Sequence, residues 1–168
     1  MKKILPHHKE SGFSLIELMI VVAIIAITVA FALPKMIGQR ADAKLQGALN
    51  NLKGDLNVAK SMAVRENATV VVLFEADGYQ VFVDNGASSG NWVREGDEHL
   101  LRNRRLPGGV SIDLAVTDLD TDRTRFNERG LPHPDYLGTI VMVDGSGGQG
   151  QIHMNRLGRL TVDLSLGE

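Results

Sequence analysis

The apolar residues of the chain are concentrated near its N-terminus. The segment 13–33 holds 21 residues, of which only Ser14, Glu17 and Thr28 are not apolar, and it contains no lysine or arginine. At about 1.5 Å per residue, an α-helix of this length spans about 30 Å, which matches the hydrocarbon layer of a bilayer. The pattern therefore predicts a membrane-spanning helix over 13–33.

A helical pattern with only one apolar face follows over 34–66. Pro34 is expected to kink or weaken the helix without dividing it into domains. Gly47, Gly54 and Ser61 lie seven residues apart, which fits either a close approach of another backbone or ordinary surface positions. The apolar positions recur at steps of three and four and predict a buried stripe: Leu45, Ala48, Leu49, Leu52, Leu56, Ala59, Met62 and Ala63. The charged positions are assigned to the solvent side: Lys44, Lys53, Asp55, Lys60 and Arg65.

From Ala68 onward the apolar residues alternate as they do in strands. Asp77-Gly78 is typical of a tight hairpin turn between the first two strands. No second long helical pattern appears, so the fold class is α+β: a long N-terminal helix packed on a small antiparallel β-sandwich, the head, over 67–168. The expected strands are 69–75, 79–84, 100–103, 110–117, 124–127, 139–143, 151–155 and 160–164.

Two features near the start of the chain are unusual for a secretory signal. Such a signal has a small-residue cleavage site after its apolar region, whereas here the small residue, Gly12, precedes that region at the end of a short, polar, net positive leader over 1–12. Glu17 lies inside the apolar segment, where an unpaired carboxylate costs at least about 2.5 kcal/mol. Cleavage between Gly12 and Phe13 would create an amine that could neutralise Glu17 of a neighbouring copy.

Gly12-Phe13-Ser14-Leu15-Ile16-Glu17 followed by an apolar helix resembles the prepilin signal of type IV pilins and pseudopilins. The resemblance implies cleavage after Gly12 by a prepilin peptidase, N-methylation of Phe13, and a role of Glu17 in fixing the register of subunits. It also implies a single-pass protein of the bacterial inner membrane, with its leader cytoplasmic before cleavage and its head in the periplasm.

A prepilin helix followed by an all-β head is similar to the GspH/FimT family in particular. The segments 125–130, 138–142 and 158–162 look like the closing strands of that family. The resemblance implies a minor pilin or pseudopilin at the tip of a filament in a type II secretion or type IV pilus machine. The implied partners are other subunits of the same filament, the prepilin peptidase and methyltransferase, the inner-membrane assembly platform, membrane lipid, and secreted cargo or DNA. The residues leave the choice between a secretion system and a pilus open.

Composition and motifs point away from catalysis. The 168-residue chain has no cysteine, which excludes disulfides, thiolate nucleophiles and cysteine-ligated metals. The acidic run at 118–122 lacks the glycine and glutamate that a calcium-binding EF-hand loop requires. The glycine pattern at 145–150 precedes a strand pattern, whereas a dinucleotide fingerprint opens a helix. His99, His133 and His153 stand outside any catalytic motif. We therefore expect neither an enzyme nor a protein with a cofactor or metal.

Nucleic-acid binding is the alternative function. The head has nine arginines, no lysine and fifteen acidic residues, so its net charge of about −6 disfavours a surface that coats DNA. Some FimT-like proteins bind DNA for uptake and share a Gly-Arg-x-Arg element, of which Gly158-Arg159-Leu160-Thr161 keeps only the first arginine. The candidate DNA contacts fall in two groups, Arg102, Arg104 and Arg105 before Pro107, and Arg156 and Arg159 near the C-terminus. Ordinary ion pairing or subunit contacts are the other reading of these arginines.

Overall fold

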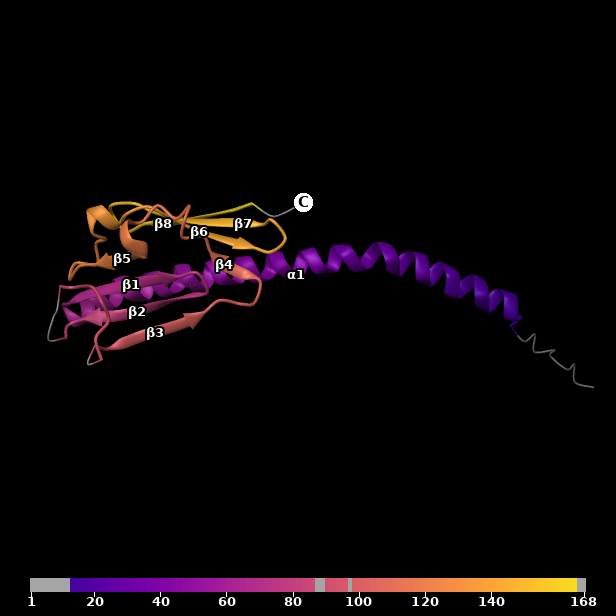
Figure 1. Cartoon of the computed structure of the whole chain (residues 1–168), viewed down its shortest axis with the longest axis horizontal. Helices are drawn as coiled ribbons and strands as arrows, with labels where there is room; N and C mark the ends of the chain where they lie inside the picture. The colour runs from indigo at the N-terminus through magenta and orange to yellow at the C-terminus, as the bar shows by residue number, and fades with distance from the viewer. Residues whose placement is uncertain (1–12, 87–89, 97, 166–168) are drawn as a thin grey trace, which may run out of the picture. The chain divides into compact units, whose positions relative to one another are not determined.

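The computed structural model describes residues 13–86, 90–96 and 98–165, apart from the side chains of residues 32–39, 120 and 136. One long helix, α1 (Leu15–Glu66), precedes a set of short strands (Figure 1). The strands are β1 (Thr69–Glu75), β2 (Gly78–Asp84), β3 (Leu100–Arg105), β4 (Val110–Ile112), β5 (Arg123–Phe126), β6 (Thr139–Asp144), β7 (Gln149–Met154) and β8 (Leu160–Ser165). Two single 3₁₀ turns, Asp120–Asp122 and Pro134–Tyr136, complete the described elements.

The chain divides into two compact units, Met1–Ile37 and Gly38–Glu168, and α1 contributes to both. Helical backbone continues through Pro34, whose side chain lies outside the described residues, so the kink stays a prediction. Within the described part of the chain, no helical stretch combines the length and the apolar character needed to cross a bilayer. The predicted segment 13–33 runs into residues whose side chains are not described, and the membrane helix also stays a prediction.

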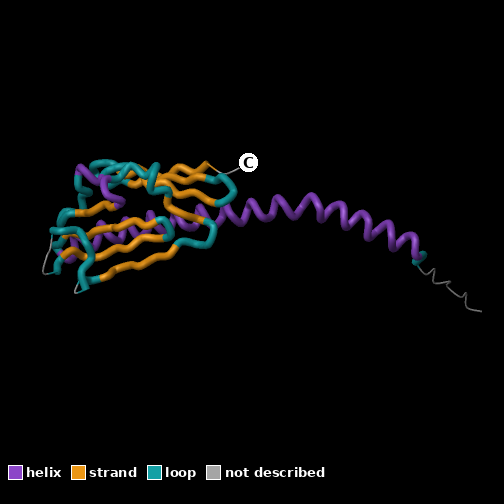
Figure 2. The backbone as a smooth tube through the Cα atoms, viewed as in Figure 1, coloured by secondary structure: helices purple, strands orange, loops and turns teal. Residues whose placement is uncertain are grey.

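The second unit contains two four-stranded antiparallel sheets (Figure 2). Sheet A has the order β3-β2-β1-β5, and sheet B has the order β4-β6-β7-β8. Neighbouring strands in both sheets run antiparallel, which confirms the predicted α+β class with an antiparallel head.

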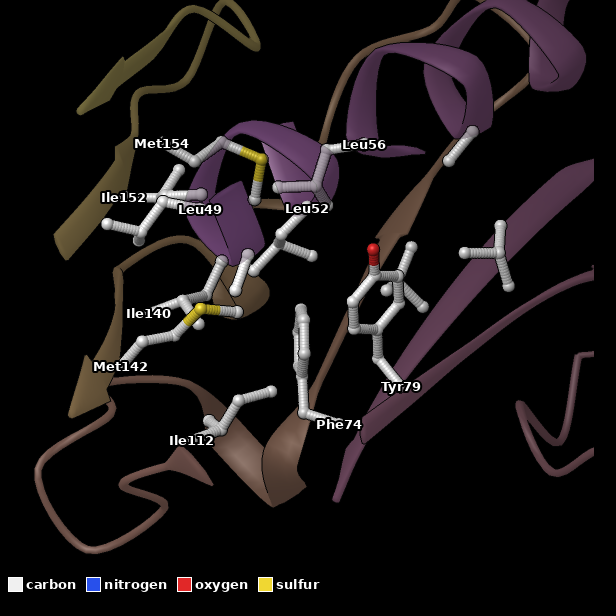
Figure 3. Close-up of a cluster of buried hydrophobic side chains, with 14 of the residues drawn as sticks. Leu49, Leu52, Leu56, Phe74, Tyr79, Ile112, Ile140, Met142, Ile152 and Met154 are labelled. Carbon is white, nitrogen blue, oxygen red and sulfur yellow. The ribbon is translucent and has the colours of Figure 1, made fainter. Parts of the chain in front are cut away.

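The helix supplies part of the core of the head. The predicted stripe is confirmed, because its leucines and alanines are at most 2% exposed and Met62 packs against them. Figure 3 shows Leu49, Leu52 and Leu56 lying between side chains of sheet B, among them Ile152, and Phe74 of sheet A. Both sheets therefore bury their apolar faces against the same helical stripe.

The predicted strand boundaries differ from the observed ones at several ends, and two of the differences have local reasons. The strand expected over 110–117 ends at Ile112, because Asp113 starts a turn in which its Oδ1 accepts a hydrogen bond from the Ala115 amide at 3.1 Å. The first hairpin turns at Ala76-Asp77, since Glu75 pairs with Gly78. Gly78 is a strand residue whose missing Cβ leaves room for the carbonyl of Arg104.

The structure also tests two predictions about glycine residues. Apart from the adjacent residues and the backbone of the helix itself, no atom of the described residues lies within 4 Å of a Cβ placed on Gly47 or Gly54, so both are surface positions there. The glycine pattern at 145–150 covers the turn 145–148 between β6 and β7 and the first two residues of β7, which confirms a hairpin.

Candidate assembly and interaction sites

The first four turns of α1 expose large apolar side chains on all sides. Every large apolar residue from Phe13 to Phe31 is at least 45% exposed, and Phe13 itself reaches 81%. A helix that is apolar all round is ordinarily buried in a protein core or in a membrane, and a large exposed apolar surface marks an interaction site. This helical stretch is therefore the largest candidate interaction surface of the described residues.

Ser14 starts the helix and was missed by the sequence reasoning. The Glu17 amide donates to the Ser14 carbonyl at 3.1 Å and lies 3.3 Å from Ser14 Oγ, as expected of an N-cap serine. Serine followed three residues later by glutamate is the signature of a capping box, and this signal was available in the sequence. Glu17 lies exposed in the first helical turn, where its negative charge complements the helix dipole.

Among the other predicted site residues of this region, Phe13 directly precedes the Ser14 cap, and Gly12 lies outside the described residues. Thr28 is the other polar residue of the apolar stretch. Its hydroxyl donates to the carbonyls of Ile24 and Ile25 at 3.0 and 2.8 Å, so its hydrogen-bonding capacity is met inside the helix.

Asp55 corrects the assignment of the charged helix positions to solvent. It is only 5% exposed, because residues of β2 and β3 surround its carboxylate. Tyr79 Oη donates to Asp55 Oδ2 at 2.7 Å, and Arg104 Nε donates to the same oxygen at 2.9 Å. Arg102 Nε lies 3.5 Å from Oδ1. A carboxylate can be buried in this way when donors and cations satisfy it.

The pKa values in this cluster reflect the same contacts. Burial by itself would raise the pKa of Asp55, but hydrogen bonds from Arg104 and Tyr79 and the charges of Arg104 and Arg102 outweigh burial, so the pKa is lowered. Burial and the hydrogen bond to Asp55 raise the pKa of Tyr79. The charged carboxylate and the neutral phenol therefore stabilise each other at neutral pH.

The five candidate DNA-contacting arginines do not form one site. Arg102 and Arg104 bind Asp55, and Arg105 lies 3.6 Å from Asp77 in an exposed ion pair. All three belong to β3, an edge strand of sheet A, whereas Arg156 and Arg159 lie in the turn between β7 and β8 of sheet B. Arg156 and Arg159 are exposed and have no ion pair among the described residues.

The turn that carries Arg156 and Arg159 has a structural twin. In loop 155–159, Asn155 Oδ1 accepts from the Leu157 and Arg159 amides at 3.0 and 2.9 Å. In loop 127–131, Asn127 Oδ1 accepts from the Arg129 and Leu131 amides, both at 3.0 Å. The shared pattern is Asn-x-x-Gly-x, in which Gly130 and Gly158 have φ of 70° and 71°, a conformation that favours glycine. A search for short internal repeats would have found this pair in the sequence.

Two families match the sequence. The family described as type II transport protein GspH matches residues 48–158. The prokaryotic N-terminal methylation motif matches residues 7–33, which include the predicted cleavage site, Glu17 and the apolar segment. Together the two matches cover both compact units of the chain.

Two relatives extend over most of the chain. The pilin-like protein PilA1 of Thermus thermophilus is 26% identical in an alignment 170 residues long, and the alignment covers 90% of this chain and 97% of that protein. Type II secretion system protein H of Aeromonas hydrophila is 23% identical over 140 residues, which cover 82% of this chain and 76% of that protein.

The fold is similar to that of a solved minor pilin. FimU of Pseudomonas aeruginosa superimposes with a TM-score of 0.54 at 17% sequence identity, covering 72% of this chain and 89% of FimU. A second crystal form of FimU gives a TM-score of 0.51 at 18% identity, with 71% and 92% covered. At this level of identity the likeness shows the fold.

Proposed function

The chain belongs to the family of the type II transport protein GspH, and we propose that it is a structural subunit at the tip of a filament anchored in the inner membrane. Its class follows from that family and its relatives: it is a minor pilin or pseudopilin of a type II secretion or type IV pilus system, and such subunits are not enzymes. The mechanical role proposed here rests on one observation, the exposure of the large apolar side chains from Phe13 to Phe31.

The proposal begins with processing of the N-terminus. A prepilin peptidase cleaves between Gly12 and Phe13, and the new amine of Phe13 is then methylated. The match of residues 7–33 to the methylation motif supports this step. The Ser14 cap supports it too, because the helix starts two residues after the proposed cut and needs nothing from the leader to begin.

Before assembly, the apolar segment 13–33 resides in the inner membrane with the head in the periplasm. Exposed side chains such as Ile20 and Phe31 are stabilised by lipid in that location, and the internally bonded Thr28 hydroxyl costs little there. The assembly platform then moves subunits out of the lipid into a filament. In the filament the apolar helices of neighbouring subunits replace lipid as the packing partner.

Glu17 and the Phe13 amine fix the register of that packing. A carboxylate buried among apolar helices is stable only if a cation lies beside it, and the amine of the neighbouring subunit provides one. Glu17 is exposed within its own chain, which leaves its carboxylate available to a neighbour.

The test compares three variants of the full chain in cells that assemble the filament. Glu17→Ala and Glu17→Gln should both remain in the membrane fraction but be lost from sheared filaments, because neither retains the charge. Ser14→Ala is the matched control: it removes the helix cap, worth about 1 kcal/mol, and keeps the charge. Normal incorporation of both Glu17 variants would refute the register role.

Processing is tested separately by mass spectrometry of the membrane fraction. The expected chain begins at methylated Phe13. An intact leader in cells with an active prepilin peptidase would contradict this part of the proposal.

DNA binding for transformation is the second candidate, and the unpaired, exposed Arg156 and Arg159 favour it. Contacts from arginine to phosphate weaken steeply with salt. A gel shift with duplex DNA across a salt series tests it: binding that disappears in the Arg156→Ala, Arg159→Ala double variant supports the DNA function. Binding that is absent, or unchanged in the variant, refutes it.

A further inference from the structure

Sheets A and B have four edge strands, of which β5 and β4 are closed by other parts of the chain. Beside β5, the Asn127 amide donates to the Leu131 carbonyl at 2.9 Å, and a bridge between residues 126 and 132 continues this pairing. β4 is three residues long, and its Ile112 amide donates to the Ala76 carbonyl at 2.9 Å. Both edges therefore find backbone partners within the chain itself.

The other two edge strands, β3 and β8, differ in charge. Three of the six residues of β3 are arginines, and charged side chains on an edge strand oppose the addition of a further strand. β8 has a single charged residue, Asp163, and no proline. Its side away from β7, which we call the open edge, is therefore the sheet edge best suited to take a strand from a partner.

The backbone groups on the open edge follow from the pairing of β8 with β7. The Asn155 amide donates to the Arg159 carbonyl at 3.1 Å, so these two residues form a hydrogen-bonded pair that continues the antiparallel ladder. Hydrogen-bonded and non-hydrogen-bonded pairs alternate along such a ladder. Every second residue from Thr161 onward therefore bonds to β7. The residues between them direct their amides and carbonyls to the open edge: Leu160, Val162 and Leu164.

The apolar side chains of these three residues are covered only in part. They pack against the core of the head, yet each remains partly exposed. By contrast, Ile152 and Met154 of the neighbouring β7 are at most 1% exposed. A strand added at the open edge would cover the three side chains, so it would gain apolar burial as well as backbone hydrogen bonds.

The solvent face of β8 carries two charges of opposite sign. Arg159, just before the strand, and Asp163 are four residues apart, so their side chains lie on the same face. Both are exposed, and neither has an ion pair among the described residues. Opposite charges on neighbouring strands are favourable. A fitting strand therefore places a carboxylate beside Arg159 and a basic side chain beside Asp163.

A second copy of this chain does not fit the open edge. β8 runs antiparallel to α1, because Gly158 at its start contacts Lys60, and Gly150, which pairs with Leu164 near its end, lies against Leu49. Antiparallel pairing of two β8 strands would point their helices in opposite directions, whereas the proposed function anchors both in one membrane. Parallel pairing through the same edge would turn one sheet over and place its apolar side chains beside the charged face of the other.

We propose that β8 takes up a strand from a different subunit of the filament, so that sheet B continues into the head of that neighbour. This contact deepens the proposed function, on which it rests, by naming how a tip subunit binds the next protein. A single short strand binds weakly, but anchoring in one filament raises the local concentration of its partner. DNA cannot replace the strand, because it has no alternating row of amides and carbonyls.

Photo-cross-linking in cells that assemble the filament tests the contact on the full chain. The photo-reactive residue benzoylphenylalanine replaces Thr161, which is exposed beside the open edge, or Asn103, which is exposed on β3 and serves as the matched control. Illumination should join the Thr161-substituted chain to another subunit of the sheared filaments. Mass spectrometry of the product should place the cross-link in a strand with an acidic and a basic residue. The control should give no such product.

Proline substitution tests whether backbone pairing forms the contact. Val162→Pro removes an amide on the open edge, where proline is tolerated, so the cross-linked yield should fall by about fivefold, the factor expected for one lost hydrogen bond. Leu164→Pro makes the same change nearer the end of the strand. Asn103→Pro is the control and should leave the yield unchanged. Its amide also faces a free edge, because the Leu106 amide donates to the Asp77 carbonyl and fixes the alternation along β3.

Charge reversal tests the fit of the partner strand. Arg159→Glu should lower the cross-linked yield by about threefold, because it places two like charges on neighbouring strands. Arg94→Glu, at an exposed position in the loop between β2 and β3, should leave the yield unchanged. Native Trp92 fluorescence identifies the variants that are folded.

Three outcomes would overturn the proposal. The Thr161-substituted chain gives no more product than the Asn103 control, or the product joins two copies of this chain, or every folded variant of the open edge keeps the full yield. The native chain is measured in sheared filaments in parallel. Its presence there without the cross-link rejects this contact alone, whereas its absence from the filaments rejects the proposed function.

Discussion

Replacing Asp55 by asparagine should destabilise the head although it changes a single atom. The side chain of Asp55, taken by itself, is 8% exposed, and its carboxylate joins the helix to β2 and β3 through Tyr79 and Arg104. Asparagine has nearly the same shape and can still accept one hydrogen bond. The substitution therefore removes the charge without creating a cavity.

The magnitude follows from the exposure of each partner. The hydrogen bond from buried Tyr79 changes from a charged to a neutral acceptor, which costs about 1 kcal/mol. The arginine side chains are 46% and 40% exposed, so water screens their ion pairs and these add only about 1 kcal/mol together. We expect Asp55→Asn to lower the free energy of unfolding by about 2 kcal/mol at pH 7.

The effect of Asp55→Asn should depend on pH in a defined direction. The native pKa of Asp55 lies below its ordinary value of 3.8, so the unfolded chain takes up the proton first as the pH falls. The stabilisation by Asp55 is complete above pH 3.8 and is lost as the pH falls through the lowered native pKa. The difference between the native chain and the variant should shrink over that range.

Urea unfolding of the full chain in detergent measures this difference. Trp92, the single tryptophan, stacks on Arg125 with its ring centre 3.6 Å from the guanidinium carbon, so its fluorescence should report unfolding of the head. Asp77→Asn is the matched control, because its ion pair with Arg105 is exposed on both sides and should change stability by less than about 0.5 kcal/mol. Equal stability of the two variants, or a difference that persists below the acid range, would refute the reasoning.

Three further substitutions can be followed by the same unfolding assay. Gly150→Ala should lower the free energy of unfolding by about 1–3 kcal/mol, because the new methyl group collides with the Leu49 side chain. Gly54→Ala should raise it by about 0.5–1 kcal/mol, since this helical position is exposed and open. Glu98→Gln should raise the free energy of unfolding at pH 7 by about 1 kcal/mol. Burial and the charge of Asp84 raise the native pKa of Glu98, so its charged form destabilises the native state. The difference from the native chain should vanish below the ordinary pKa of 4.5, where Glu98 is protonated in both states.

The fold could be predicted where burial follows a simple period. The stripe from Leu45 to Ala63 and the span 69–75 came out as expected, because one face of a helix and alternate positions of a strand must meet the same core. Asp55 could not be predicted, since its partners Tyr79 and Arg104 come from strands 24 and 49 residues away. A helical pattern records which positions are polar, but it contains no information about a donor that tertiary folding brings to one of them.

The candidate sites also differ in how far the sequence could predict them. The arginines at 102–105 and at 156–159 look alike in the sequence, yet the first group contains two arginines that bind Asp55, and the second remains unpaired among the described residues. Only the three-dimensional position of the nearest acid separates a structural arginine from one available to a partner. The exposed apolar side chains from Phe13 to Phe31 are a second case in which the sequence does not identify the partner. A sequence can predict that such a surface needs a partner, but the partner lies outside the chain, and its identity has to come from assembly experiments.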